Sequence, residues 1–219
     1  MFAKELISEE IPVLHQNDTG NRALELMGDF KIRHLPLIDH DEYVCLVSDK
    51  DVFGMRKTDD PIGKVNIFAP AVREDRNWTE ALNIADRFNL SLVPVVTENN
   101  VYLGCITLKT LIAKSAEMFN VSAEGSILIL EVNPQDYTLS EIAKIVESNN
   151  AKILSLFTGI IGNTNKLRIW MKINLEDASP VIRSFERFNY NVLFYFMRRS
   201  IIDDLLQKRL DEFLHYLKI

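Results

Sequence analysis

Ser48 and Asp51 are the residues of this sequence whose types and spacing most favour binding chemistry. Ser48 is expected to begin a short helix, and Asp51 follows three positions later, in its first turn. Backbone N–H groups and the helix dipole favour an anion at such a start. The Asp51 carboxylate can accept hydrogen bonds from a pair of hydroxyl groups. The alternative is structural, because Ser is a good N-cap and Asp favours a first helical turn.

Other residues that often carry chemistry show no functional grouping in the sequence. The four histidines lack metal-ligand spacing: His15, His34, His40 and His215. The two cysteines, Cys45 and Cys105, are expected to be small buried thiols. No motif places a Ser-His-Asp or Cys-His group, and no glycine-rich phosphate loop is present. We therefore expect neither an enzyme nor a metal site.

An internal repeat determines the predicted fold of the first half. An apolar strand containing Pro36 recurs with Pro94, and the two prolines are 94 − 36 = 58 residues apart. The hydroxyl residues that follow, Ser48 and Thr107, are 107 − 48 = 59 residues apart. A recurrence at this period indicates two copies of one structural unit. Proline lacks an N–H donor, so each is expected at a sheet edge or a strand start.

Each copy is predicted to contain an entry strand, a helix, a two-stranded hairpin and a second helix. The first hairpin is expected at residues 35–38 and 43–47, and the second at 92–96 and 101–106. A polar linker separates the copies near residues 57–66. We therefore predict domains at residues 1–60 and 61–120.

The second half of the chain changes its order of elements. Residues 126–197 are predicted to follow the order β-α-β-β-α-β, which is a ferredoxin-like plait. Residues 198–219 are predicted to form a C-terminal amphipathic helix, with Ser200 as a possible cap. Its apolar stripe is expected to dock on the body of the protein or on a second chain.

Composition narrows the class of protein. The chain has 219 residues, of which 47% are hydrophobic, so it can bury sizeable cores. The net charge of −6 argues against nucleic-acid binding. We expect no membrane span and no signal peptide. The presence of only two cysteines suggests a reducing compartment, and we interpret the protein as cytoplasmic.

The two repeated strand motifs resemble those of CBS domains. The first copy reads Leu35-Pro36-Leu37-Ile38-Asp39, then Cys45-Leu46-Val47-Ser48-Asp49-Lys50-Asp51. The second reads Val93-Pro94-Val95-Val96-Thr97, then Gly104-Cys105-Ile106-Thr107-Leu108-Lys109-Thr110. The resemblance covers about residues 1–120. It implies a compact pair with two clefts, which in many relatives bind adenosine nucleotides.

The resemblance also implies roles for individual residues. Ser48 and Asp51 match the Ser/Thr and Asp of CBS nucleotide binders, and Arg33 matches a basic residue that lies near phosphate in some relatives. A guanidinium suits phosphate oxygens. The second copy keeps Thr107 but has Thr110 in place of the ribose aspartate and Ser91 in place of the basic residue. We therefore expect at most one competent site per chain.

Residues 126–197 are similar to an ACT domain, and the combination resembles the acetoin-utilisation accessory family, whose members are regarded as regulators. Ligand-binding ACT domains usually carry a glycine in the loop after the first strand. Tyr137 stands at that position here, and its side chain would fill the space that a ligand needs. Pairing between two chains is the expected use of this domain, with amino-acid binding as an alternative.

The sequence thus predicts an α+β protein: a CBS-domain pair, a ferredoxin-like ACT domain and a C-terminal helix. The predicted function is regulatory and non-catalytic. An adenine nucleotide (AMP, ADP or ATP) is the candidate ligand, bound by Arg33, Ser48, Asp51 and Thr107, and no cofactor is required. A homodimer and a regulated protein partner are expected. The main alternative is a ligand-free dimeric scaffold for a partner protein.

Overall fold

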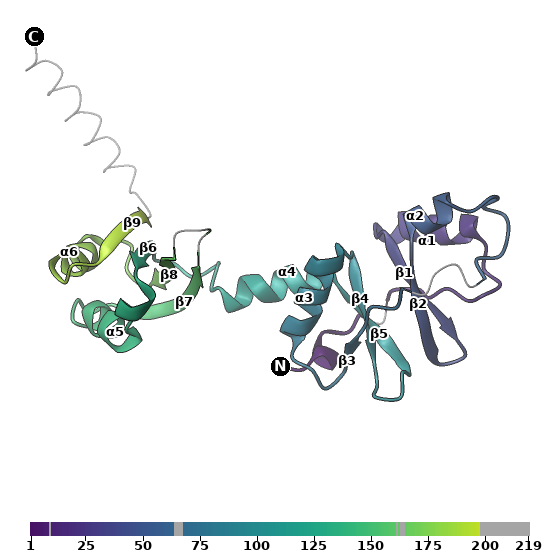
Figure 1. The fold of residues 1–219 in the computed structure, drawn as a ribbon, viewed down its shortest axis with the longest axis horizontal. Coiled ribbons are helices and arrows are strands. Elements are labelled where there is room, and N and C mark those ends of the chain that lie inside the picture. The colour runs from purple at the N-terminus through teal and green to yellow at the C-terminus, as the bar shows by residue number, and fades with distance from the viewer. Residues whose placement is uncertain (9, 64–67, 161, 163–164, 198–219) are drawn as a thin grey trace, which may run out of the picture. The chain divides into compact units, whose positions relative to one another are not determined.

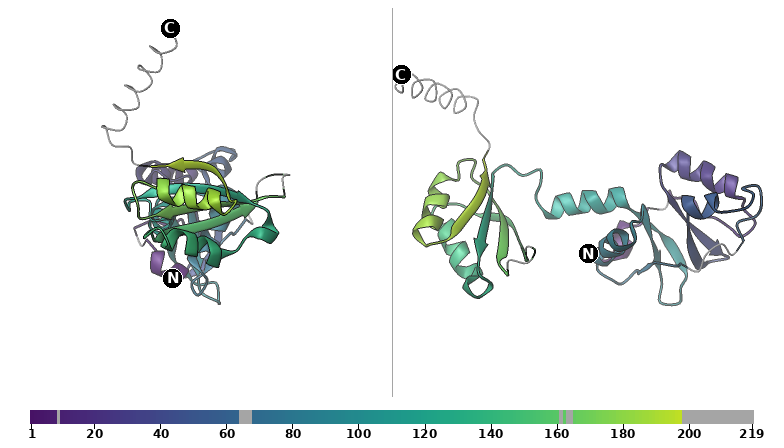
Figure 2. Two further views of the ribbon diagram at one scale, coloured as in Figure 1. Left: turned by 90° about the vertical axis from the view of Figure 1, so that its left-hand side faces the viewer. Right: turned by 45° about the horizontal axis from the view of Figure 1, so that its top comes forward.

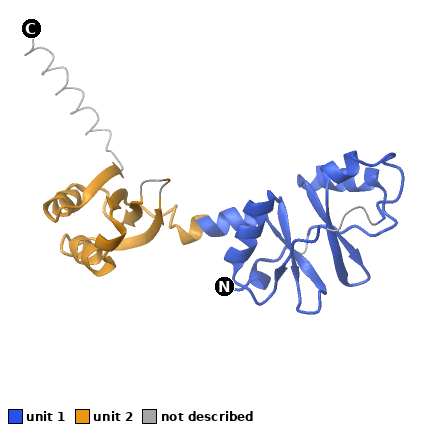
Figure 3. Ribbon diagram, viewed as in Figure 1, with its two compact units in different colours: residues 1–115 blue, residues 116–219 orange. Residues whose placement is uncertain are grey.

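The structure is a computed structural model that describes residues 1–8, 10–63, 68–160, 162 and 165–197. It contains two compact units, Met1–Ser115 and Ala116–Ile219 (Figure 3). The predicted C-terminal helix, 198–219, lies outside the described residues.

The first unit contains the two predicted copies in the expected order (Figure 1). The first copy follows a short 3-10 helix, η1 (Ala3–Leu6), and comprises α1 (Gly20–Phe30), β1 (His34–Asp39), β2 (Glu42–Ser48) and α2 (Asp49–Phe53). The second copy comprises β3 (Val72–Arg73), α3 (Trp78–Phe88), β4 (Leu92–Val96), β5 (Tyr102–Thr107) and α4 (Leu108–Met118). The repeat therefore covers whole structural units.

The two hairpins pair in matching registers. Leu37 lies opposite Cys45 in the antiparallel β1–β2 pair, and Val95 lies opposite Gly104 in β4–β5. In the parallel β3–β4 pair, Val72 lies beside Val95, and a single parallel bridge from Leu14 to Leu37 takes its place in the first copy.

The two repeated prolines lie within strands. β4 is the central strand of the order β3-β4-β5, so the predicted edge position is wrong for Pro94. β3 pairs only with Val95 and Val96, beyond the proline. The missing N–H of Pro94 therefore interrupts none of the pairing between β3 and β4.

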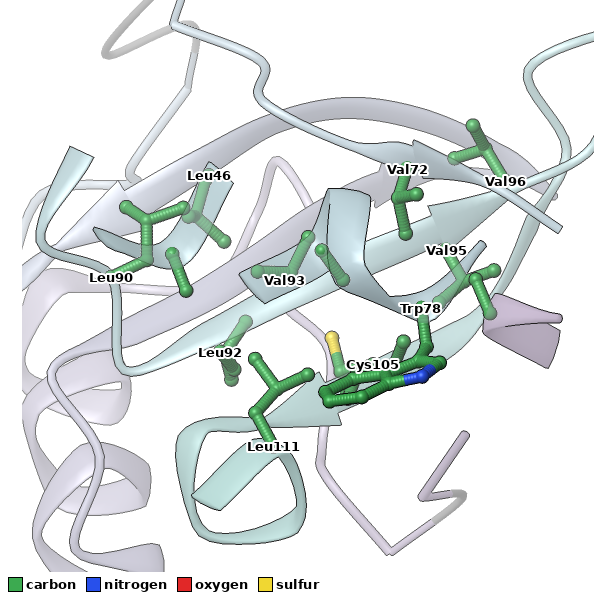
Figure 4. Packing of buried hydrophobic residues seen from close by; sticks show 14 of the residues in the cluster. Leu46, Val72, Trp78, Leu90, Leu92, Val93, Val95, Val96, Cys105 and Leu111 are labelled. Atoms are coloured by element: carbon green, nitrogen blue, oxygen red, sulfur yellow. The ribbon is translucent and has the colours of Figure 1, made fainter. Parts of the chain in front are cut away.

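Apolar side chains from both copies share one core. Leu46 and Tyr43 of β2 pack with the buried side chains of the second copy, including Trp78 and Leu92 (Figure 4). A further cluster around Leu35 fills the first copy. Cross-packing of this kind makes the pair one folding unit, because burial of apolar area is the main favourable term in folding.

The equivalent ends of α1 and α3 do not pack as predicted. Their spacing in the sequence places Phe30 and Phe88 on the apolar faces of these helices, but their side chains are 42% and 39% exposed. Both helices end at a residue in the left-handed conformation, Lys31 and Asn89. This cap stops the helix directly after each phenylalanine.

The second unit has the predicted ferredoxin-like order. It comprises β6 (Ser126–Val132), a 3-10 turn η2 (Pro134–Asp136), α5 (Leu139–Glu147), β7 (Ile153–Ile160), β8 (Leu167–Ile173), α6 (Ser179–Arg187) and β9 (Asn191–Phe196). The antiparallel sheet has the order β7-β8-β6-β9. Both helices cover the same face of this sheet (Figure 2).

Buried and more exposed side chains alternate along the strands of this sheet, so its two faces differ. Ile169, Met171 and Ile173 of β8 are buried under the helices, as their spacing predicts. The glycines and asparagines at positions 159–165 suggest a turn that includes Gly159, but Gly159 lies in β7 opposite Arg168. The hairpin is therefore longer than the glycine pattern suggests.

Gly125 directly precedes β6 of the second unit, and its backbone has a conformation that side chains rarely adopt, with φ of +137°. A Cβ atom at this position would collide with the backbone of Ile173 and Asn174. We predict that Gly125→Ala destabilises the second unit by at least about 2 kcal/mol. The measurement is the urea midpoint of the second unit, followed by the emission of Trp170 in a Trp78→Phe background.

Gly28→Ala is the matched control, because Gly28 lies in α1 with open space around it. It should stabilise the first unit by up to about 1 kcal/mol, the difference in helix propensity between Gly and Ala. This change in the stability of the first unit is measured by Trp78 emission in a Trp170→Phe background. An unchanged urea midpoint for the second unit of Gly125→Ala would contradict the collision.

Candidate functional site

Three of the four predicted site residues line one cavity in the first unit. The cavity has a volume of about 290 Å³. It is lined by Arg33, His34, Leu46, Ser48, Asp49, Lys50, Asp51, Phe68, Phe88, Asn89 and Leu90. Arg33, Ser48 and Asp51 come from the first copy, whereas Phe88, Asn89 and Leu90 come from the end of α3. The two copies therefore build the site jointly.

Ser48 and Asp51 hold each other at the end of β2. The Ser48 hydroxyl donates to Asp51 Oδ2 over 2.6 Å, and the Ser48 backbone N–H donates to the same oxygen over 2.8 Å. In return, the Asp51 backbone N–H donates to Ser48 Oγ over 3.2 Å. This reciprocal cap fixes the position of the carboxylate at the cavity wall.

The first backbone N–H groups of α2 already have partners. The Asp49 N–H donates to the Arg33 carbonyl over 3.0 Å, and the Lys50 N–H donates to Asp49 Oδ1 over 2.8 Å. With Asp51 bonded to Ser48, the first three N–H groups of the helix are all used. The structure therefore does not provide the expected anion site at free helix N–H groups. Phosphate contacts in this cavity must come from side-chain cations.

Arg33 is one of the cations that line the cavity, and it is paired with Asp49. Arg33 Nε donates to Asp49 Oδ2 over 3.1 Å, and the Arg33 side chain is 57% exposed. Burial opposes ionisation of Asp49, but the hydrogen bonds from Arg33 and the Lys50 backbone, with the Arg33 charge, outweigh it. The pKa of Asp49 is therefore lowered. Since a guanidinium carries five donors, Arg33 keeps others beyond this contact.

Ser91 connects the second copy to this site. Ser91 Oγ accepts a hydrogen bond from the Arg33 backbone N–H over 3.0 Å, and it lies 3.0 Å from His34 Nδ1. The Ser91 backbone N–H donates to the same His34 nitrogen over 3.2 Å. Nδ1 therefore acts as an acceptor, which is the neutral form of the ring. Burial lowers the pKa of His34 and outweighs the nearby Asp49 carboxylate.

Thr107, the fourth predicted residue, lies at the equivalent point of the second copy and does not line this cavity. Its Oγ1 accepts a hydrogen bond from the Thr110 backbone N–H over 3.1 Å and lies 2.9 Å from Thr110 Oγ1. Two hydroxyls thus replace the Ser48–Asp51 pair. A role for Thr107 in ligand binding stays a prediction.

Sequence reasoning missed the aromatic wall of the cavity. Phe68 and Phe88 meet edge to face, with ring centroids 5.0 Å apart. The available signal was the apolar residue at the end of each repeated helix, which we assigned to the core. The exposed ring of Phe88 instead faces a cavity built from both copies.

The second unit has its own cavity beside the β6–α5 loop, with a volume of about 400 Å³. Its charged lining residues are Glu131, Asp136, Glu141 and Lys166. Lys166 pairs with Glu131 over 3.0 Å. Tyr137 packs against the core of the unit, as its bulk in place of glycine suggests. The excess of carboxylates does not suit the carboxylate of an amino acid.

Both cysteines are free and buried. Burial raises the pKa of the Cys105 thiol to about 12. Their interpretation as packed thiols is confirmed. Within the described residues, no group of three or more His, Cys, Asp or Glu side chains could hold a metal ion. No helix in the same part of the chain has the length and hydropathy to cross a bilayer.

A pair of repeated α+β copies that share a cleft defines the class of this protein. The family model of the CBS domain matches residues 3–57 and again residues 60–117, which together are more than half of the chain. The chain therefore belongs to the CBS-domain family.

One curated relative is inosine-5'-monophosphate dehydrogenase from Methanocaldococcus jannaschii, with 26% identity over 117 residues. The match covers 51% of this chain and 23% of the relative. The chain thus matches only about a quarter of that enzyme's length.

Similar solved structures include a CBS domain pair/ACT domain protein from Thermotoga maritima, with 21% identity and a TM-score of 0.49. That match covers 53% of this chain and 98% of the other. A putative acetoin utilization protein from Vibrio cholerae has 19% identity and a TM-score of 0.49, over 56% and 95% of the two chains.

The neutral His34 ring predicts a dependence of stability on pH. Its pKa in the folded chain lies below 6.5, so the unfolded chain binds the proton first as the pH falls. The contribution of His34 to stability is complete above pH 6.5 and is lost as the pH falls through its folded pKa. We predict that the urea midpoint of the first unit, followed by Trp78 emission in a Trp170→Phe chain, decreases from pH 7.5 to pH 5.5.

His34→Asn should reduce this decrease, because an amide oxygen can still accept the Ser91 N–H and does not titrate. His15→Asn is the control, since His15 is exposed. An equal decrease in the parent and in His34→Asn would contradict the assignment.

Proposed function

We propose that this protein is a non-catalytic sensor that binds an adenine nucleotide in the cavity between the two CBS copies. CBS-domain pairs typically bind adenine nucleotides as regulatory modules. The observation that carries the proposal is that Arg33, Ser48 and Asp51 line one cavity with two aromatic rings. Each part of a nucleotide then has a chemically matched partner.

The ribose is assigned to Asp51. An ionised carboxylate has about four acceptor positions on its two oxygens. Asp51 can therefore keep its bonds to Ser48 and accept from ribose hydroxyls as well. The reciprocal cap holds the carboxylate in place before the ligand arrives, which lowers the entropic cost of binding.

The phosphate is assigned to Arg33. With the first N–H groups of α2 occupied, Arg33 and Lys50 are the cations that line the cavity within the described part of the chain. Asp49 and Asp51 balance their charge. A lining with as many carboxylates as cations favours few phosphate charges, so we propose AMP over ATP.

The base is assigned to the apolar wall. Phe68 and Phe88 provide aromatic surface, and Leu46 and Leu90 line the same cavity. Base stacking on aromatic side chains contributes about 1–3 kcal/mol per base in nucleic-acid complexes.

Binding at this place is coupled to the contact between the copies. A bound phosphate can draw the Arg33 side chain away from Asp49. The backbone N–H of the same Arg33 donates to Ser91 Oγ, so this movement acts on the contact between the copies. A ligand shifts such an equilibrium only if it favours one arrangement. We propose that this shift reaches a regulated partner through the ferredoxin-like unit or a homodimer contact. The two buried free thiols support a cytoplasmic location.

Asp51→Ala is predicted to weaken AMP binding at least tenfold, because it removes the ribose acceptor. The measurement is titration calorimetry of the full chain, with circular dichroism as the folding check. Thr110→Ala is the matched control at the equivalent position of the second copy, and it should bind AMP as the parent does. Equal affinity of Asp51→Ala and parent would reject the site.

Arg33→Gln is predicted to separate phosphate recognition from nucleoside recognition. It should weaken AMP at least tenfold and leave adenosine affinity within about twofold, since only AMP has a phosphate for the guanidinium. Equal losses for both ligands would show that Arg33 acts through the fold. No binding of AMP or adenosine to the parent would favour the scaffold alternative.

A further inference from the structure

The face of the second unit's sheet opposite its helices is apolar and aromatic. One cross-strand row contains Phe157 of β7, Trp170 of β8, Ile129 of β6 and Phe194 of β9. The next row places Ile127 beside Phe196. Phe194 and Phe196 are 56% and 60% exposed. We call these six residues the open face.

Part of the open face is already lined by the chain that enters the unit. The Phe119 ring meets Phe157 edge to face at 4.6 Å, and Lys172 Nζ donates to the Asn120 carbonyl over 2.6 Å. Between this segment and the strands lies a groove of about 450 Å³. Trp170 and Ile127 line the groove.

One nitrogen of a charged side chain on the same side of the sheet lacks a hydrogen-bond partner among the described residues. Arg168 lies on β8 in the same alternation as Trp170, opposite Glu131 and Gly159. Its Nε atom is buried, and it has no hydrogen-bond partner among the described residues. A buried donor without an acceptor is destabilising, so this position favours an acidic group.

We propose that residues 198–219 of the same chain cover the open face. This segment follows directly after β9, the strand that carries Phe194 and Phe196. Its apolar residues recur at helical spacing: Ile201, Ile202, Leu205, Leu206, Leu210, Phe213, Leu214 and Leu217. Four carboxylates accompany them and can pair with Arg168: Asp203, Asp204, Asp211 and Glu212.

The length of the segment fits this occupant. Neighbouring strands lie about 4.8 Å apart, so a four-stranded sheet is about 14 Å wide between its outer strands. A helix over residues 201–217 would extend about 24 Å at 1.5 Å per residue. Residues 198–200 remain for the turn out of β9. The segment is therefore long enough to span the open face of its own sheet.

The test uses Trp170 as a reporter, because Trp78 is the only other tryptophan. In a Trp78→Phe chain, Leu206→Glu with Leu210→Glu should shift Trp170 emission to the red and increase acrylamide quenching at least twofold. The matched control, Gln207→Glu with Lys208→Glu, places its charges off the apolar stripe and should leave both unchanged. Unchanged emission in the leucine variant would overturn the proposal.

Sedimentation and isotope filtering distinguish this occupant from a second copy. Trp170 emission of the parent should not change on dilution, and the leucine variant should keep the parent's mass. Nuclear Overhauser effects between the Trp170 indole and the leucine methyl groups of the segment should arise within one chain. Their appearance between chains in a mixed-label sample, or their absence, would overturn the proposal even if the variants fail to fold.

Discussion

The hydrogen bonds that Ser91 makes to Arg33 and His34 are the contact on which the site depends. They join the start of β1 to the turn between α3 and β4, beside the cavity. Leu90 and Phe88, which also line the cavity, lie within three residues of Ser91. A shift at this contact would therefore move the cation and the aromatic wall relative to each other. In the proposed function, this contact is the route by which a ligand in the cavity would act on the rest of the module.

The same short segment serves stability and, in the proposed function, ligand recognition. Asp51 caps α2 through Ser48, and its carboxylate also forms part of the cavity wall. The structural and the functional interpretations of Ser48 and Asp51 are thus compatible, because an ionised carboxylate has acceptor positions for both. In the second copy, Thr107 and Thr110 retain the capping geometry and lack the charge. The two copies therefore differ in the charge at this position and keep the same local capping geometry.

The elements could be predicted from the sequence because their signals are local. The prolines at a spacing of 58 residues gave the repeat, and the alternation of Ile169, Met171 and Ile173 gave the buried face of β8. The cavity could be predicted only in part. Phe88 and Ser91 come from the other copy, and no local pattern shows which residues a tertiary contact brings together. The occupation of the first N–H groups of α2 by Asp49 and Ser48 likewise depends on rotamers that spacing does not reveal.

The most direct test of the proposed ribose contact at Asp51 compares the affinities of two ligands for two proteins. AMP and 3'-deoxy-AMP are titrated into the parent and into Asp51→Ala. If Asp51 accepts the ribose hydroxyls, the parent binds AMP at least tenfold more tightly than the deoxy analogue, and Asp51→Ala binds the two with nearly equal affinity. If the parent does not distinguish the two ligands, or Asp51→Ala distinguishes them as the parent does, the nucleotide does not lie as proposed.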